Sequence, residues 1–509
     1  MKKLLFLCSL IGILFTSCAD DIDDRVPKRR PPTPSPAPIP TPDQGILITP
    51  LTDSSTTHMG GSQRGENPDD LPSNHSFTEQ VLVNFTESSV TVTSHIGISF
   101  VKRGAHITLT SSANNIEYIL SGSASSGSFK LISSQPYKLT LNNLSLSNED
   151  GATIHLRGNN GKAFIHLNDD TNNFLSDGTT YSSIHGEDPT ATLYSTSHMI
   201  IDGEGKLSIK GKYKHGIASL GYLHILNGEI SITEASENGI QLRSHFIGDG
   251  GTISINNQNG QGNALAVGNG SIIINQGKYL LKAKSNGIVA SSEETTIDPY
   301  ITINGGEIKI IAFAKGIHTT SILTLTNATI DLNTIGTAVT GLKGIYINSG
   351  SYNLLATTGS GLRSDEEVAF TGGRTFLKCG ASPETPINVP LSGAFHIKAG
   401  TLIALGGTPS GKASLSEPSY PAMIWNEALQ SQSLLHLREG DREVFTFLLP
   451  ISATYFLFSS DKFIQGRNYA LYKDGNVLNG TQEKGLYSEG RYVGGTLIRE
   501  FTANRTINP

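Results

Sequence analysis

Cysteine is scarce in this chain of 509 residues, which contains only three of them. Cys8 and Cys18 both lie within the first 18 residues, so the rest of the chain has Cys379 alone. One cysteine cannot form an intramolecular disulfide, and a buried apolar cysteine is commoner than a reactive one. The fold must therefore be stabilised by packing, and Cys379 is predicted to be structural.

Charge is also scarce, since Asp, Glu, Lys and Arg make up 16% of the residues against about 25% in an average soluble protein. The net charge is a mild −6, and no basic stretch with interleaved aromatic residues occurs, which argues against nucleic-acid binding. Helical periodicity is missing from most of the chain. Glycine, by contrast, is abundant at 55 residues, as tight turns between short strands require. These features predict an all-β protein.

A repeated phrase, a small turn followed by an apolar residue, occupies the chain from His215 to Phe376. Its copies lie about 22 to 29 residues apart, which indicates a solenoid. Alternating apolar residues predict three short strands in each repeat, and parallel crossovers favour one hand, so we expect a right-handed parallel β-helix. A propeller blade would need about 40 or more residues. The copies begin at His215, Asn238, Asn263, Asn286, Lys315, Thr337 and Ser360.

The remaining sequence divides into segments around this repeat. Residues 1–17 have the basic start and short apolar core of a signal peptide, 18–44 are acidic and then proline-rich like a semi-rigid tether, and 45–76 predict a flexible lead-in. The β-helix is expected over 77–380. Because solenoid ends must be covered, β caps are expected at both ends, with 381–509 forming the C-terminal β cap or a small appended β unit.

Cys18 stands where the apolar run of the signal peptide ends, after two small residues. This arrangement resembles a bacterial lipobox, which implies that Cys18 becomes the acylated first residue of the mature protein. The acidic run that follows resembles the surface-export signal of some outer-membrane lipoproteins. We therefore expect a membrane partner through a lipid anchor, and a location at the outer membrane or cell surface.

Several phrases resemble a known family, the right-handed β-helical carbohydrate-binding domains first seen in a cellulose- and acid-sugar-binding protein. The matching stretches are 139–146, 150–154, 167–178, 201–207, 213–219, 458–461 and 487–495. The resemblance implies polysaccharide binding, association with calcium, and a pectate-lyase-like fold without established catalysis. Members often carry Asp before Gly-Ile in the turn, where this chain has Asn238, Asn263, Asn286 and Lys315, and only Asp150 keeps the acid. Fewer carboxylates lower calcium affinity.

Asp169, Asp170 and Asp177 surround a turn, and with Asp150 they are the candidate calcium ligands. The alternative is that they bond to their own local backbone as Asx turns. Asn238, Asn263 and Asn286 should stack at one corner of consecutive coils. Stacked amides predict a hydrogen-bonded asparagine ladder rather than a ligand site.

A candidate sugar-binding group lies near the longest break before the regular repeat. It comprises Tyr181, His185, Glu187, Asp188 and Tyr213. An aromatic platform with a few carboxylates suits a sugar ring, whereas the alternative is that these are solvated loop residues. Both interpretations stay open on the sequence.

Catalytic signals are weak. The Asn-Thr-Asp and Gly-His-Gly phrases of β-helical polygalacturonases are absent, and no acid cluster recurs on the outward positions of adjacent repeats. Glycoside hydrolysis needs two carboxylates facing each other across the bond. The sequence predicts a non-catalytic lipoprotein that binds polysaccharide, cellulose-like or acidic. The alternatives are a polysaccharide lyase or glycoside hydrolase of the same fold, and an adhesin or structural surface protein.

Overall fold

The computed structural model describes residues 45–158, 161–182, 186–381, 383–417, 419–504 and 506–507. The chain divides into two units, Met1–Thr41 and Pro42–Pro509, and the second contains all the described residues. The predicted signal peptide, Cys18, the tether and His185 lie outside the described residues. No helix within the described ranges is long and apolar enough to cross a membrane.

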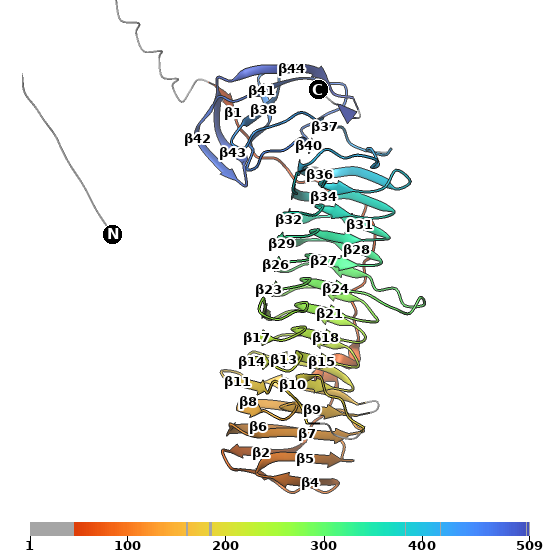
Figure 1. Ribbon diagram of the computed structural model, residues 1–509, viewed down its shortest axis with the longest axis vertical. Helices are drawn as coiled ribbons and strands as arrows, with labels where there is room; N and C mark the ends of the chain where they lie inside the picture. The colour runs from red at the N-terminus through yellow and green to blue at the C-terminus, as the bar shows by residue number, and fades with distance from the viewer. Residues whose placement is uncertain are drawn as a thin grey trace, which may run out of the picture. The chain divides into compact units, whose positions relative to one another are not determined.

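The second unit is almost entirely β, and most of it is a parallel β-solenoid of about 12 turns, as the repeat predicted (Figure 1). Two 3-10 helices, η1 (Pro68–Asp70) and η2 (Pro72–Asn74), are the helical elements of the described chain. Each regular coil contributes one strand to each of three columns. The predicted all-β class and the parallel β-solenoid are therefore confirmed.

The first column is a 13-stranded sheet in which β4 and β5 pair antiparallel and every later pair is parallel. In order, its strands are β4 (Ile98–Arg103), β5 (Ala105–Ser111), β7 (Gly127–Ser133), β9 (Ile154–Arg157), β12 (Ala191–Ser195), β15 (His215–Ser219), β18 (Ile240–Leu242), β21 (Leu265–Val267), β24 (Ile288–Ala290), β27 (Ile317–Thr319), β30 (Val339–Gly341), β33 (Leu362–Arg363) and β35 (Ile387–Asn388).

The second and third columns are parallel stacks that share long strands near both ends of the solenoid. The second contains β10 (Lys162–Leu167), β13 (His198–Gly203), β16 (Leu223–Ile225), β19 (Phe246–Gly248), β22 (Ile272–Ile274), β25 (Ile301–Ile303), β28 (Ile322–Leu325) and β31 (Gly344–Ile347). The third contains β11 (Asn172–Asp177), β14 (Lys206–Gly211), β17 (Glu229–Ala235), β20 (Thr252–Asn257), β23 (Lys278–Ala283), β26 (Glu307–Ala312), β29 (Ala328–Thr334) and β32 (Gly350–Ala356). The shared strands are β2 (Glu79–Thr86), β6 (Ile116–Ala124), β8 (Tyr137–Asn148), β34 (Glu367–Lys378) and β36 (Ala394–Gly406), and β3 (Ser89–Val92) pairs antiparallel with β2.

The interior is built from the apolar columns that the repeat predicted. Ile230 pairs with Ile253, which pairs with Tyr279, and all three are buried. A steric constraint explains why a small residue, such as Gly239, precedes the apolar residue in each turn. A Cβ on Gly239 would lie 2.4 Å from the Cγ2 of Ile255, so the turn passes too close to the interior for a side chain.

The C-terminal region extends the solenoid further than predicted, because β35 and β36 still stack in parallel on β33 and β34. Antiparallel pairing of β36 with β40 then ends the stack. Beyond it, a seven-stranded antiparallel sheet packs over a core of buried aromatics that includes Phe445, Phe447, Phe456 and Phe458. The strands of this region are β1 (Ile46–Leu47), β37 (Ala422–Trp425), β38 (Leu434–Glu439), β39 (Arg442–Leu448), β40 (Tyr455–Ser459), β41 (Asn468–Lys473), β42 (Asn476–Glu483), β43 (Leu486–Val493), β44 (Thr496–Thr502) and β45 (Thr506–Ile507).

Residues 45–78, called the strap here, cross the outer face of the second column from its last coils to its first (Figure 1). The strap begins with β1 on the C-terminal sheet. Its Met59 amide donates to Asn348, and its Gly61 amide donates to Thr324. The flexible lead-in expected for 45–76 is therefore wrong, since this segment has fixed partners along the solenoid.

The strap explains why outward-facing residues of the second column are apolar. Ile200, Ile247 and Ile273 point away from the solenoid interior yet are at most 8% exposed. A second row of asparagines holds the strap backbone. Asn275, Asn304 and Asn348 donate to the carbonyl oxygens of Arg64, Gln63 and Met59 respectively.

Asp70 fastens the strap near the first coils of the solenoid. Its side chain is fully buried, and it accepts hydrogen bonds from Lys162 at 2.7 Å, from Tyr222 and from Nδ1 of His224 at 2.9 Å. The other ring nitrogen of His224 lies 2.9 Å from Asp249. Burial alone would raise the pKa of Asp70, but the hydrogen bonds lower it to about 2.

Candidate functional site

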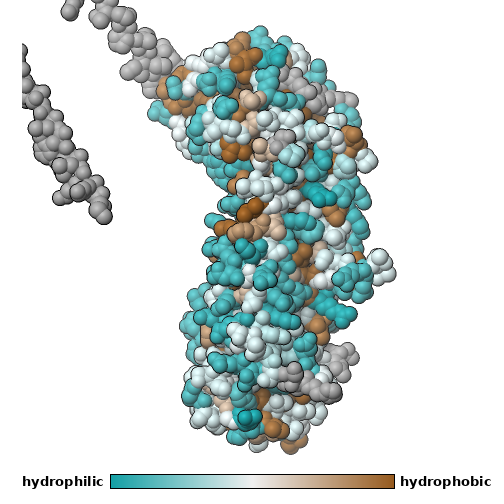
Figure 2. Space-filling view, viewed as in Figure 1, coloured by the Kyte–Doolittle hydropathy of each residue, from teal (hydrophilic) through white to brown (hydrophobic). Residues whose placement is uncertain are grey.

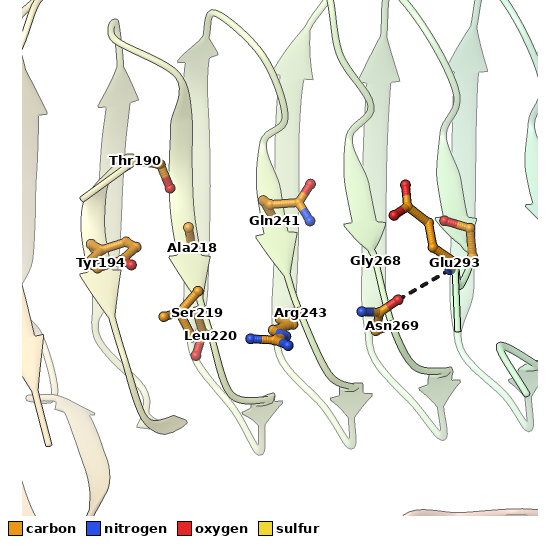
Figure 3. Close-up of a pocket in the computed structure, with 11 residues that line it drawn as sticks. Thr190, Tyr194, Ala218, Ser219, Leu220, Gln241, Arg243, Gly268, Asn269 and Glu293 are labelled. Atoms are coloured by element: carbon orange, nitrogen blue, oxygen red, sulfur yellow. Dashed lines mark hydrogen bonds between the residues drawn. The ribbon is translucent and has the colours of Figure 1, made fainter. Parts of the chain in front are cut away.

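A groove of about 370 Å³ crosses the outer face of the first column between β12 and β24 (Figure 3). Outward side chains of neighbouring coils pair here in register, with Tyr194 beside Ala218 and Ala218 beside Gln241. Small residues such as Ala218 and Gly268 leave the hollow. The lining residues are Thr190, Tyr194, Ala218, Ser219, Leu220, Gln241, Arg243, Gly268, Asn269, Ser291 and Glu293.

Two of the residues predicted to bind sugars lie behind the β12 end of the groove. Tyr181 stacks on Tyr213 with ring centroids 4.2 Å apart, and it packs against the cluster that contains Tyr194 and Ala218. Its hydroxyl donates to Asp177 at 2.6 Å. The structure thus brings Tyr181 and Tyr213 together, and it places them beside the groove rather than among its lining residues.

Glu187, another predicted sugar-binding residue, bonds to side chains of β7 and β9 and does not line the groove. Its carboxylate accepts from Lys130 and from Arg157, each at 2.5 Å, and lies 3.7 Å from His155. Burial, followed by the charge of Lys130, lowers the pKa of His155 to about 4, so this histidine is neutral at pH 7. Asp188, which follows Glu187 in the chain, is exposed. Glu187 is therefore committed to protein contacts and has little capacity left for a ligand.

The wall at the β24 end consists of polar side chains that bond to one another. Asn269 Oδ1 accepts from the amide of Glu293 at 3.4 Å (Figure 3). It also accepts from the hydroxyl of Ser292 at 3.2 Å. The Nδ2 atom of Asn269 donates to Glu294 at 3.2 Å. This network fixes the loop after β24, so the groove is bounded at this end.

Arg243 supplies a positive charge to the groove floor. Among the described residues, no carboxylate lies within ion-pair distance of it. The cationic character continues along the same face, where Lys315 lies 3.4 Å from His318. Burial and then the charges of Lys315 and Arg363 lower the pKa of His318 to about 4. Arg363 pairs with Asp365 at 3.8 Å, so Arg243 and Lys315 are the cations of this face without an acidic partner among the described residues. Unpaired cations favour an anionic ligand.

The candidate calcium ligands are not gathered into one site. Asp177 is buried, and its two oxygens already accept from Tyr181 and from the amide of Lys212. Asp169 accepts from the Glu204 amide at 3.3 Å, and Asp170 adopts a positive φ of 59° in a turn. Together with Asp150 they do not converge, and the described chain has no group of three or more His, Cys, Asp or Glu that could hold a metal ion. Calcium binding stays a prediction that this donor arrangement does not support.

The three stacked asparagines bond along the solenoid axis. Asn263 Nδ2 donates to Asn238 Oδ1 at 3.0 Å, and Asn286 Nδ2 donates to Asn263 Oδ1 at 2.8 Å. The amide of Lys315 then donates to Asn286 Oδ1. Every amide oxygen of this row has an internal donor, so the row rigidifies the corner next to the groove.

The sequence did not predict the groove residues, because the prediction selected aromatic and charged residues of the segment before the regular repeat. One position in the sequence could have indicated the groove: the residue that follows each Gly-Ile phrase or its equivalent and points outward. On successive coils this residue is Ala218, Gln241, Ala266 and Val289. Short side chains there leave room for a ligand, but this position is informative only once the coil register is known.

A family described as carbohydrate-binding domain-containing protein matches residues 103–269 and 259–383. These two matches together span more than half of the chain, including every coil that borders the groove. The chain belongs to this family. Among solved structures it is similar to a polysaccharide lyase-like protein from C. thermocellum, with 22% identity, 61% of this chain and 96% of that chain covered, and a TM-score of 0.37. No curated protein matches.

Proposed function

We propose that this member of the carbohydrate-binding domain family is a surface-anchored lipoprotein that holds a polysaccharide in the groove between β12 and β24 without cleaving it. The observation that carries the proposal is the groove itself, whose floor and far wall present a cation and amide groups. Attachment would be through Cys18 at the outer membrane or cell surface. The proposal includes right-handed winding, which parallel crossovers favour, and β elements that cover both solenoid ends.

The dimensions suit a linear glycan lying along the solenoid axis. Five first-column strands separated by about 4.8 Å give the groove a length of roughly 19 Å. The amide groups of Gln241 and Asn269 stand on different coils. Each NH2 group donates one of its two N–H groups inside the protein, to Leu242 and to Glu294 respectively, and the second N–H can bond to a hydroxyl of a sugar unit. Amides and hydroxyls placed on a rigid sheet lose little entropy on binding, so modest contacts still give affinity.

The lining holds one cation, Arg243, and one carboxylate, Glu293, so the preference for an acidic glycan over a neutral one rests on Arg243. Arg243 lacks an acidic partner among the described residues, and its guanidinium can bond a carboxylate through two N–H groups. Lys315 extends this positive character further along the first column, whereas the charge of Arg363 is offset by Asp365 at 3.8 Å. The protein as a whole is negative at −6, so such binding would depend on this face rather than on bulk charge.

Binding without cleavage is supported by the composition of the lining. Glu293 is the single carboxylate among the groove residues that the structure describes. Hydrolysis requires two carboxyl groups on opposite sides of the glycosidic bond.

Retention on insoluble polysaccharides tests the proposal. Crosslinked polygalacturonate should retain the protein more strongly than cellulose, and the difference should shrink as salt rises because exposed charges are screened. Retention on neither polymer nor on host glycans would refute carbohydrate binding. Release of unsaturated or reducing ends during the same incubation would instead identify a lyase or hydrolase. A parallel sample with a chelator tests the calcium prediction.

A further inference from the structure

The first coil of the solenoid presents open strand edges. β4 is the terminal strand of the 13-stranded sheet and pairs with β5 alone, and β3 pairs with β2 alone, among the described strands. Both lie at the end of the solenoid remote from the C-terminal sheet (Figure 1). An open edge carries free backbone N–H and C=O groups that can pair with another strand.

Large apolar side chains are exposed around the same edge, and Figure 2 shows hydrophobic residues at this end of the molecule. Ile96 is 93% exposed and Val101 is 76% exposed. Leu82 at 48% and Phe100 at 42% lie in the same first coil. Together with the free backbone groups, these side chains form a surface suited to protein contact, which we call the tip.

We propose that the tip is an interface with a second copy of this chain, in which the two β4 strands pair antiparallel about a two-fold axis at Val101. An isologous interface needs a surface that is complementary to itself. Antiparallel pairing centred on Val101 sets this residue against its own counterpart. It also sets Lys102, whose ammonium donates to the Val90 carbonyl at 3.1 Å, against Phe100 of the second copy, where the aliphatic part of the lysine can pack on the ring.

The charges at the two ends of β4 are complementary under this pairing. Arg103 stands at the C-terminal end of the strand, and it would lie beside the N-terminal end of the second β4. There His95 lies 4.0 Å from Glu79, whose side chain is exposed. Arg103 of each copy therefore approaches an acid of the other. A strand that is basic at one end and borders an acid at the other favours its own copy over an unrelated partner.

This proposal is independent of glycan binding, so it can be tested on the full chain carrying Cys8→Ser and Cys18→Ser, in which Cys379 is the remaining, buried cysteine. Sedimentation equilibrium should show a concentration-dependent dimer. Val101→Lys, which sets like charges against each other, should raise the dimer dissociation constant by roughly tenfold or more. Leu391→Lys is the matched control, because Leu391 is 73% exposed but lies outside the tip, and it should leave the constant unchanged.

Two further variants distinguish this geometry from non-specific association. Val101→Cys should form an intermolecular disulfide under mild oxidation, whereas Leu391→Cys should not. Arg103→Glu should weaken the dimer, and adding Glu79→Arg should restore it. A monomer at all concentrations, or a dimer that is indifferent to both Val101→Lys and the charge exchange, would overturn the proposal.

Discussion

Replacing Asp70 with asparagine should loosen the strap while keeping the shape of the side chain. The carboxylate is fully buried and accepts hydrogen bonds from Lys162, Tyr222 and His224. The amide removes the negative charge that opposes two cationic partners. Breaking a buried ion pair from one side leaves the other charge uncompensated, which is the costly case.

The pKa of Asp70 gives the magnitude of the free energy by which the ionised carboxylate stabilises the strap. Its value of about 2 against an ordinary 3.8 is a difference of almost two units, which corresponds to about 2–3 kcal/mol of stabilisation by the ionised form. If the strap opens as a local unit, Asp70→Asn should speed hydrogen exchange of residues 66–78 by roughly 30- to 150-fold. The solenoid coils should exchange as before.

Asp53→Asn is the matched control, because Asp53 belongs to the same strap but is 35% exposed and pairs with Arg374 at 3.1 Å. Exposed pairs contribute about 0–1 kcal/mol, so exchange should change by less than roughly fivefold. Hydrogen exchange detected by mass spectrometry at neutral pH measures both variants. Equal effects of the two substitutions, or no effect of Asp70→Asn, would refute the idea that the buried carboxylate holds the strap.

The same cluster predicts how strap stability depends on pH. The folded pKa of Asp70 is lowered, so its contribution is complete above about pH 4 and is lost as the pH falls through 2. Burial alone would lower the pKa of His224, but Asp249 and Asp70 raise it to about 9. That contribution is complete below about pH 6.5 and is lost as the pH rises through 9. Exchange of the strap, corrected for intrinsic rates, should therefore be slowest between about pH 4 and 6.5.

Three further predictions concern the solenoid and its anchor. Asn263→Ala removes the centre of the asparagine row and should destabilise the protein by about 1–3 kcal/mol in thermal unfolding, because its neighbours lose partners. Gly239→Ala should lower the melting temperature at least as much as Asn263→Ala does, because the new Cβ would clash with the side chain of Ile255. An unchanged melting temperature of Gly239→Ala would contradict the close packing of that turn. Cys18→Ala should release a soluble form from membranes, and persistent membrane association would show that lipidation is not the anchor.

The solenoid was predictable because its interior repeats. Residues such as Ile230 and Ile253 recur at a fixed spacing, and each coil buries them against the next, so the periodicity reports the core directly. The extension of the solenoid through β36 was not predictable in this way. Long strands there replace the short repeat, and Phe395 and Ile397 continue the core without the turn phrase.

The strap and the groove were not visible in the sequence for different physical reasons. The strap is held by backbone groups and by polar side chains such as Asn304, which impose no periodicity on its own residues. The groove exists because small residues such as Ala218 and Gly268 leave space on the outer face, and the sequence does not show that space until the neighbouring side chains are placed. Of the predicted sugar-binding residues, Glu187 turned out to bond with Lys130 and Arg157, contacts between coils that depend on register.

Calorimetric titration with an oligogalacturonate tests most directly whether the groove binds an acidic glycan. Arg243→Ala should weaken binding at least about tenfold, the effect of losing a charge-assisted hydrogen bond of roughly 1.5–3 kcal/mol. Arg499→Ala, which removes an exposed arginine from β44 in the C-terminal sheet, should leave the affinity unchanged. Equal affinities of wild type and Arg243→Ala would contradict the assignment of the groove, and loss of binding in Arg499→Ala alone would move the site to the C-terminal sheet.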